Sequence, residues 1–238
     1  MYKLTSVLTL LVALLTVMPG QAATKKKTGW QKQGLKGKVK TIETSNYEIK
    51  IVFGESKQVL SSKSIHKYDA AGNRIERASY KADGSLSSKS IHKYDAAGNM
   101  IENTKYIDDG SLVFKFIYKY DAAGNRIERA YYKADGSLSY KFIAKYDATG
   151  NRIEGADYKA DGSLSSKSIA KYDASGNKIE SASYKADGSL SSKHIYKYDA
   201  AGNKIEEAIF AIKSQFGQTE SIQTGLTTVT YEYYGPSE

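Results

Sequence analysis

Tyr68-Asp69-Ala70-Ala71-Gly72-Asn73 is a motif that the chain repeats at a fixed interval of 26 residues. Its six copies begin at Tyr68, Tyr94, Tyr120, Tyr146, Tyr172 and Tyr198. A second motif, Asp-Gly-Ser-Leu, alternates with the first and begins at Asp83, Asp109, Asp135, Asp161 and Asp187. A constant period of this length is typical of supersecondary units that stack on their neighbours, so it predicts a repeat fold.

Both motifs are typical of tight hairpin turns. In residues 69–73, a type I turn would be followed by Gly72 in the left-handed conformation, which forms a bulge. The Asp69 carboxylate can accept hydrogen bonds from the turn backbone. Residues 81–85 show the same pattern, with Gly84 at the bulge. Eleven such turns predict twelve antiparallel strands between about residues 59 and 210.

Pairing counted outward from the turns predicts two unlike sheet faces, because side chains alternate along a strand. The count places Lys67 opposite Ile75, and across the second turn it places Tyr80 opposite Leu86. One face would carry a ladder of isoleucines flanked by lysines, namely Ile65, Ile75, Ile91, Ile101, Ile117, Ile127 and onward to Ile205. The other face would carry tyrosines and leucines, namely Tyr68, Tyr80, Leu86, Tyr94 and their equivalents.

We therefore expect an all-β fold: an elongated, curved, antiparallel single sheet of β-hairpin repeats, with about 12 repeat strands plus capping strands. Twist and repeated bulges can leave such a sheet as an open ribbon or curl it toward a partial shell, and a curved open sheet is favoured. The expected organisation is a signal peptide at 1–22, an N-terminal linker and capping strands at 23–57, repeats at 58–210 and C-terminal capping strands at 211–238. Within the caps, strands are expected near residues 38–44, 47–52 and 227–233.

The first 22 residues have the pattern of a secretory signal. Lys3 supplies the positive start, residues 4–17 are apolar, and the small residues Gly20 and Ala22 favour cleavage after Ala22. The apolar run is shorter than the roughly 20 residues that span a bilayer, so no transmembrane segment is expected after cleavage. The mature protein is expected in the periplasm, at the cell surface or outside the cell. It has no cysteine and cannot form disulfides.

The charge balance permits attraction to anionic partners. After removal of Lys3 with the signal, 34 basic and 26 acidic residues leave a net charge near +8 (34 minus 26). Lipopolysaccharide, acidic glycans or nucleic acid could be attracted, although a solvated surface explains the same composition. Basic and acidic residues alternate through the repeats, so no specific nucleic acid partner is predicted.

Residues suited to catalysis are sparse. The chain has three histidines and one tryptophan, and it shows no metal-ligand spacing. His66 and His92 occupy equivalent repeat positions, where hydrogen-bonded surface histidines are expected, and His194 lies out of that register. The motif aspartates have turn-forming roles rather than the clustering that calcium requires. We expect no enzymatic activity, no cofactor and no metal site.

Variation between the repeats concentrates on the expected tyrosine–leucine face. Ser62, Ser64 and His66 of the first repeat become Phe114, Phe116 and Tyr118 in the third, and Tyr140, Phe142 and Ala144 in the fourth. An aromatic patch binds sugar rings or peptides when it is exposed, and it forms a packed interior where a sheet curls. Both interpretations stay open. The candidate ligand-binding residues are Phe114, Phe116, Tyr118, Tyr120, Tyr140, Phe142 and Tyr146.

The Tyr-Asp-Ala-Ala-Gly-Asn motif resembles the YD repeat of the RHS family over about residues 58–210, and the Tyr-Lys-Ala-Asp-Gly-Ser-Leu halves are more loosely similar to MORN-type repeats. The resemblance implies hairpins joined into a long coiled sheet, in secreted or surface proteins that enclose toxins, adhere or bind carbohydrate. This chain has far fewer repeats than a closed shell needs. We expect a cell-surface or envelope binding or scaffold module whose partner is a glycan, an envelope polymer or a protein. The alternative is a purely structural or assembly protein, or a remnant of an RHS-type toxin-delivery shell.

Overall fold

The computed structural model describes residues 28–215 and 218–232, so the expected signal peptide lies outside the described residues. One antiparallel sheet contains fourteen strands in the order of the sequence, and a single short helix, α1 (Gly29–Lys32), precedes them. The strands are β1 (Thr41–Val52), β2 (Glu55–Tyr68), β3 (Arg74–Lys81), β4 (Leu86–Tyr94), β5 (Met100–Ile107), β6 (Leu112–Tyr120), β7 (Arg126–Lys133), β8 (Leu138–Tyr146), β9 (Arg152–Lys159), β10 (Leu164–Tyr172), β11 (Lys178–Lys185), β12 (Leu190–Tyr198), β13 (Lys204–Gln215) and β14 (Gln218–Thr228).

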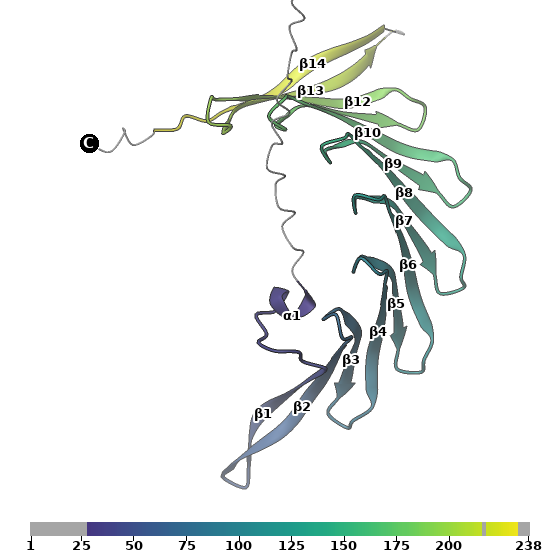
Figure 1. Ribbon diagram of the computed structural model, residues 1–238, viewed down its shortest axis with the longest axis vertical. Coiled ribbons are helices and arrows are strands. Elements are labelled where there is room, and N and C mark those ends of the chain that lie inside the picture. Colours follow the sequence, from purple (N-terminus) through teal and green to yellow (C-terminus); the bar gives the residue numbers. More distant parts are fainter. Residues whose placement is uncertain (1–27, 216–217, 233–238) are drawn as a thin grey trace, which may run out of the picture.

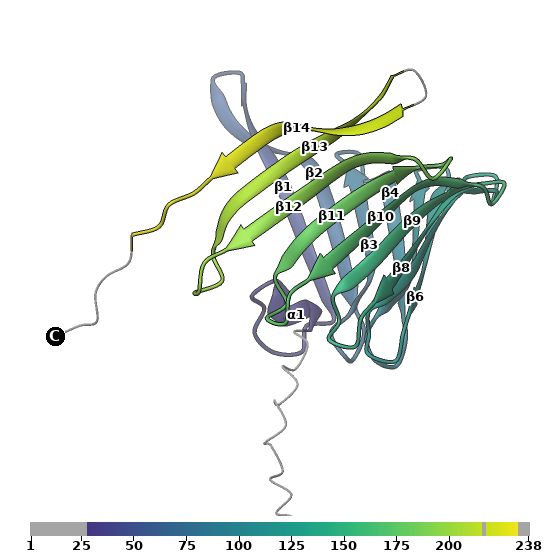
Figure 2. The ribbon, with the colours of Figure 1, turned by 90° about the horizontal axis from the view of Figure 1, so that it is seen from above.

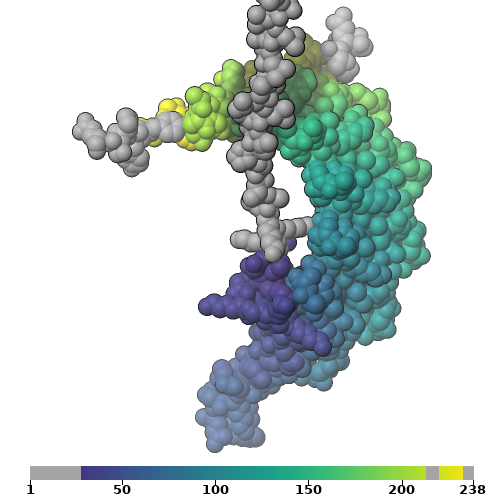
Figure 3. Space-filling view, in the orientation of Figure 1, coloured from purple at the N-terminus to yellow at the C-terminus, as the bar shows by residue number. Residues whose placement is uncertain are grey.

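The sheet is an open arc, with β1 and β14 at its two free edges (Figure 1). In the space-filling view the described residues form a crescent (Figure 3). The expected all-β, curved and open single sheet is therefore confirmed, with twelve repeat strands, β2 to β13, between two flanking strands.

The flanking strands differ in position from the expectation. At the N-terminal side, one continuous strand replaces the two expected segments. At the C-terminal side, β14 lies earlier than the expected strand at 227–233, and residues 229–232 are not in a strand. The reason is that β13 runs past the last repeat, so its partner must begin at Gln218, opposite Gln215.

The turns have the predicted hydrogen bonds. Asp69 N donates to Asn73 O at 2.9 Å, and Gly72 N donates to Asp69 O at 3.1 Å. The Asp69 Oδ1 atom accepts from Ala71 N at 2.9 Å and from Asn73 N at 2.8 Å. Gly72 has φ 83°, in the left-handed region where a Cβ causes strain, and the equivalent glycines of the other ten repeat turns also have positive φ.

The predicted register is wrong by one residue at the first turn type. Lys67 pairs with Glu76 rather than with Ile75, because Ile75 is an extra residue between the paired positions. At the second turn type, Tyr80 pairs with Leu86 as predicted, and an extra residue at Ser87 then shifts the pairing. Each turn thus carries a second irregularity in the returning strand, which the turn motif does not reveal.

This shift of one residue changes which residues share a face, because successive side chains of a strand point to opposite faces of the sheet. Tyr80 and Leu86 lie on the same face as Ile65, so the expected separation of an isoleucine face from a tyrosine–leucine face is wrong. Nor is the isoleucine ladder continuous, since Ile65 pairs with Ala78 and Ile75 lies outside the pairing. We call this side, with Lys67, Glu76, Lys89 and their equivalents, the ion-pair face. The opposite side, with His66, Tyr68, Arg74, Arg77 and their equivalents, is the arginine face.

The register also explains the curvature. Ile65 pairs with Ala78, which pairs with Lys89, and Lys89 is equivalent to Lys63 (89 minus 26). Across two strands, the position that is paired therefore moves by two residues along the repeat (65 minus 63). Such a stagger tilts the strands, as in a sheet that curls toward a barrel. The first type of turn lies at the tighter rim, where a Cβ at Gly98 would be 3.7 Å from Asn73 Oδ1, whereas Gly84 has open space around it (Figure 2).

The core is thin. On the ion-pair face, the buried positions are the small residues at the middle of alternate strands: Ala78, Thr104, Ala130, Ala156, Ala182 and Ala208. Among the described residues, no large side chain is fully buried. Stability must therefore come from strand pairing and half-buried contacts that accumulate along the array.

Candidate functional site on the arginine face

On the ion-pair face, the glutamates of the repeats lie among lysines of the same face, which number two for each glutamate. Glu76 accepts from Lys67 at 2.9 Å and from Lys89 at 3.1 Å, and Glu154 and Glu180 are each held between two lysines in the same way. Hydrogen bonds from Lys167 and then Lys145 lower the pKa of Glu154. The carboxylates of this face are therefore matched by its own lysines.

The arginine face holds all five arginines of the protein, which are Arg74, Arg77, Arg126, Arg129 and Arg152. Within the described residues, none of them forms an ion pair. Cations without carboxylate partners leave this side of the sheet with a positive potential.

The arginine face is the concave one. Helix α1 lies inside the curve (Figures 1 and 2), and Gln33 at its C-terminus accepts a hydrogen bond from Tyr68 Oη at 2.7 Å. Trp30 fixes the helix there, because its indole nitrogen donates to Val39 O at 2.6 Å and its ring covers Gly72. A long ligand could therefore follow the inner surface of the arc.

Aromatic side chains form a connected cluster over β6, β7 and β8. The ring of Phe116 lies 5.3 Å from Phe114, 6.0 Å from Tyr118 and 5.0 Å from Tyr131 between centroids. Tyr131 in turn stacks on Tyr140 at 5.1 Å. All five rings are half-buried, so they are neither sealed core nor freely exposed. Each can present an edge or part of a face to a ligand.

Tyr131 is a member of this cluster that the expected set lacked. It joins Phe116 to Tyr140, and without it the two strands of expected residues would not touch through their rings. The signal was present in the sequence, because the equivalent positions hold Ser79, Lys105, Asp157, Ser183 and Ile209. Only the correct register places this variable position beside the others.

Three of the arginines lie over aromatic rings. Arg126 is 5.5 Å from the Tyr118 ring, Arg129 is 5.6 Å from the Tyr140 ring, and Arg152 is 5.6 Å from the Phe142 ring. Gly155 leaves room for Phe142, since a Cβ there would lie 2.9 Å from Phe142 Cζ. Stacking restrains the guanidinium groups while their donors stay available, which suits recognition of carboxylate, sulfate or phosphate.

Tyr120 and Tyr146, the other two expected residues, have a role common to the repeats after the first. The Tyr120 hydroxyl donates to Met100 O at 2.9 Å, and the Tyr146 hydroxyl donates to Arg126 O at 3.1 Å. The equivalent tyrosines tie their repeats to the preceding ones in the same way. Tyr118 and Tyr120 also line an open groove of about 750 Å³ between two neighbouring turns, and burial raises the pKa of both phenols.

The two equivalent histidines are not the hydrogen-bonded surface residues that were expected. His92 is only 8 % exposed, and neither of its ring nitrogens has a hydrogen-bond partner among the described residues. Burial, and then the charge of Arg74, lowers the pKa of His92 to about 4. Burial, Arg74 and Arg77 likewise lower the pKa of His66, whose Nε2 atom is unpartnered. Both imidazoles are therefore neutral near pH 7.

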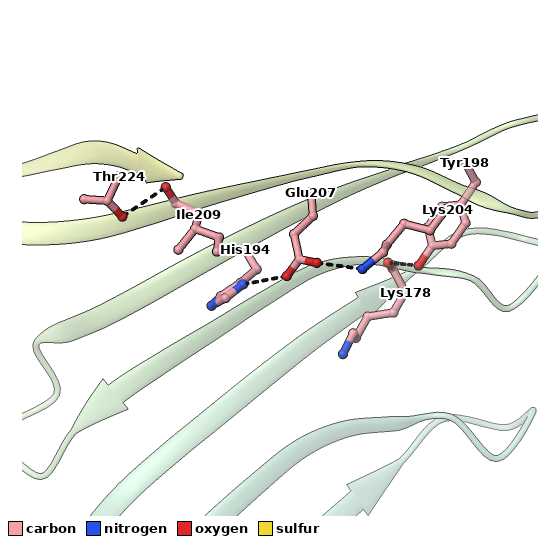
Figure 4. A network of polar contacts seen from close by, with 7 residues as sticks. All are labelled: Lys178, His194, Tyr198, Lys204, Glu207, Ile209 and Thr224. Carbon is pink, nitrogen blue, oxygen red and sulfur yellow. Dashed lines mark hydrogen bonds and ion pairs between the residues drawn. The ribbon is translucent and has the colours of Figure 1, made fainter. Parts of the chain in front are cut away.

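The C-terminal end of the arginine face contains an ion pair. Glu207 occupies the position equivalent to Arg77, and it accepts from Lys204 at 2.6 Å and contacts His194 Nδ1 at 3.1 Å (Figure 4). Hydrogen bonds from Lys204 and then His194 lower the pKa of Glu207. The arginines, which form no ion pair within the described residues, all lie between β3 and β9.

Neither a metal site nor a membrane helix is evident in the part of the chain that the structure describes. Residues 28–215 and 218–232 contain no group of three or more His, Cys, Asp or Glu side chains placed to hold a metal ion. The same residues include no helix with the length and apolar character to cross a bilayer.

No family model and no curated protein matches this sequence. Among solved structures, the chain is similar to TcdB2-TccC3 without its hypervariable C-terminal region, with TM-score 0.38 and 12 % identity over 78 % of this chain and 12 % of that one. It is also similar to a porin-like protein from Bacteroides uniformis, with TM-score 0.29 and 9 % identity over 77 % and 94 % of the two chains. The chain thus spans about an eighth of TcdB2-TccC3, and likenesses at these TM-scores carry no argument about function.

Proposed function

We propose that the protein is an exported, non-enzymatic binding module that takes an anionic glycan or envelope polymer on its arginine face. The observation that carries this proposal is the set of five arginines that form no ion pair within the described residues and lie beside the aromatic cluster, on the concave side of an open sheet. The predicted signal peptide favours an envelope polymer over nucleic acid as the ligand. A β-repeat sheet supplies the rigid scaffold.

The two kinds of side chain would have complementary roles. Half-buried rings such as Phe116 and Tyr140 offer apolar surface to the faces of sugar rings. Arg129, whose guanidinium group lies 5.6 Å from the Tyr140 ring, can bind an acidic group on the same ligand through the Nη donors at the end of its side chain. Aromatic and cationic groups only a few ångströms apart match a polymer that carries both apolar and charged faces.

A structural role for the aromatic cluster is the second candidate. The rings contact one another across β6, β7 and β8 in the middle of the arc, where packing would also stabilise the curl. In that case the cluster would contribute to stability and not to binding. Substitutions in the aromatic cluster should lower ligand affinity if the cluster binds a ligand, and should lower stability if the cluster is structural.

Titration calorimetry with a uronic acid oligosaccharide and a neutral oligosaccharide of equal length tests the proposal. Arg129→Ser and Tyr140→Ser use residues that other repeats carry at these positions, Ser181 and Ser166. We expect the charged probe to bind, and each substitution to weaken that binding about tenfold through loss of a charged hydrogen bond or a stacking surface. Lys141→Ser removes one charge from the opposite face of β8 and should leave the affinity unchanged.

Salt dependence supplies a second readout. Binding through unpaired arginines should weaken as sodium chloride is raised, because salt screens exposed charges. Absence of binding by the charged probe, or equal binding of the neutral probe, contradicts the proposal. If Tyr140→Ser lowers the thermal midpoint and no probe binds, the aromatic cluster is structural.

A further inference from the structure

The hairpin of β1 and β2 has an exposed apolar edge that the repeats do not explain. On the edge strand, Tyr47 is 57 % exposed, Ile49 is 64 % exposed and Ile51 is 68 % exposed. Among the strands that the structure describes, β1 pairs with β2 alone, and the hairpin projects beyond the neighbouring ones (Figure 1). Large apolar side chains on a free edge strand are typical of a pairing site.

Apolar and charged side chains lie on opposite sides of this edge strand. Tyr47, Ile49 and Ile51 alternate along the strand and therefore share one side. Glu48 and Lys50 lie on the other side. Ile49 is the centre of these five residues. Its direct neighbours, Glu48 and Lys50, have opposite charges, and the next residues outward, Tyr47 and Ile51, are both large and apolar.

We propose that two copies of the chain pair through β1, antiparallel and with a two-fold axis at Ile49. In this register Tyr47 faces the partner's Ile51, and Ile49 faces the partner's Ile49. Glu48 faces the partner's Lys50 and the reverse, so both charges of each strand are matched. Aromatic–aliphatic and opposite-charge pairs across antiparallel strands are stabilising, and in a two-fold interface each pair off the axis occurs twice.

The charges within one protomer support a second copy of the chain as the partner of β1. Lys50 lies directly opposite Lys57 of β2, which is an unfavourable pair of like charges. Its only ion pair within the described residues is with Glu48 along the same strand, at 3.6 Å, and both side chains are more than half exposed. A partner carboxylate directly opposite Lys50 would offset the repulsion.

The free edge at the other end of the sheet is a poorer partner for β1. β14 carries one charged residue, Glu220, and has Gly225 within the strand. Pairing of β1 with β14 of another copy would be head-to-tail and would continue beyond two subunits unless it closed into a ring. Pairing of β1 with itself stops at a dimer, which distinguishes the two arrangements.

Charge reversal tests the register in the mature full-length protein by sedimentation velocity. We expect a concentration-dependent dimer with a dissociation constant on the order of micromolar, since the paired segment is short. Lys50→Glu should weaken dimerisation about tenfold, because Glu48 would then face a glutamate. Within one protomer, the same change replaces the repulsive pair Lys50–Lys57 by a glutamate opposite Lys57, so it should not unfold the hairpin. Combining Glu48→Lys with Lys50→Glu should restore dimerisation.

Disulfide trapping gives an independent test because the chain has no cysteine. In the proposed register the two Cα atoms of residue 49 lie about 4.5–5.5 Å apart, within the range for a disulfide. Ile49→Cys should form covalent dimers on mild oxidation much faster than Ala82→Cys, which lies in an exposed repeat turn. A wild-type protein that stays monomeric to about 100 µM, assembly beyond dimers, or equal cross-linking of the two variants overturns the proposal.

Discussion

The imidazole of His92 illustrates how single residues are fitted into this thin sheet. It is buried on the arginine face, and its neutral form is favoured by burial and by the charge of Arg74. The equivalent positions hold Tyr118, Ala144, Ala170 and Tyr196, so several side chains fit there. A buried titratable group without partners makes stability depend on pH.

We predict that the protein loses stability as the pH falls from about 6.5 toward 4. The pKa of His92 is about 4 in the folded protein, against roughly 6.5 in an unfolded chain. In this window the unfolded state binds a proton that the native state does not, so the free energy of unfolding falls with the pH. The loss between pH 7 and pH 5 should be roughly 2 kcal/mol. Urea unfolding at the two pH values measures it, and an equal loss in His92→Tyr would contradict this assignment.

At the scale of the strand and turn, the repeats are held together by the tyrosine that begins each motif. Tyr94 Oη donates to Arg74 O at 3.0 Å, so it bridges two consecutive turns of the first type. The same bond recurs at Tyr120, Tyr146, Tyr172 and Tyr198. It closes the tighter rim of the arc, where the turns are already near one another.

Removal of this hydroxyl should weaken the array locally. Tyr94→Phe keeps the ring and leaves the partly buried carbonyl of Arg74 without its hydroxyl donor, so we expect a loss of about 1 kcal/mol in the free energy of unfolding. Tyr184→Phe is the matched control, since the Tyr184 hydroxyl has no hydrogen bond within residues 28–215 and 218–232. Equal losses in the two variants, measured by chemical denaturation, would show that the bond is not the cause.

At the scale of the whole molecule, each strand pairs only with its neighbours in sequence. Such an array behaves as a sum of units and interfaces, and its length is adjustable in steps of one repeat. A step of one repeat contains two strands, so it preserves the direction of every later strand. Adding or removing a single strand would reverse the direction of every later strand.

Deletion of residues 147–172 should therefore give a folded, shorter protein. The deletion removes β9 and β10 and joins Tyr146 to Asp173, which recreates the motif. We expect a cooperative urea transition with a lower m-value, because less surface is buried. Deletion of residues 160–172 removes β10 alone and places the next turn at the wrong end, so that chain should fail to fold beyond β9. Similar circular dichroism for both deletions would contradict the repeat model.

The sequence by itself determined the meander of twelve repeat strands, because spacing and turn chemistry are local properties that each motif contains in full. It also indicated Phe116 and Tyr140 through their departure from the other repeats. Which residues share a face was decided only in the tertiary structure. The extra residues at Ile75 and Ser87 lie just beyond the turns, and a slip of one position moves every later side chain to the other side of the sheet. The joining of Phe116 and Tyr140 through Tyr131, the gathering of all five arginines on the concave side, and the tilt that makes a single sheet curve all depend on that slip.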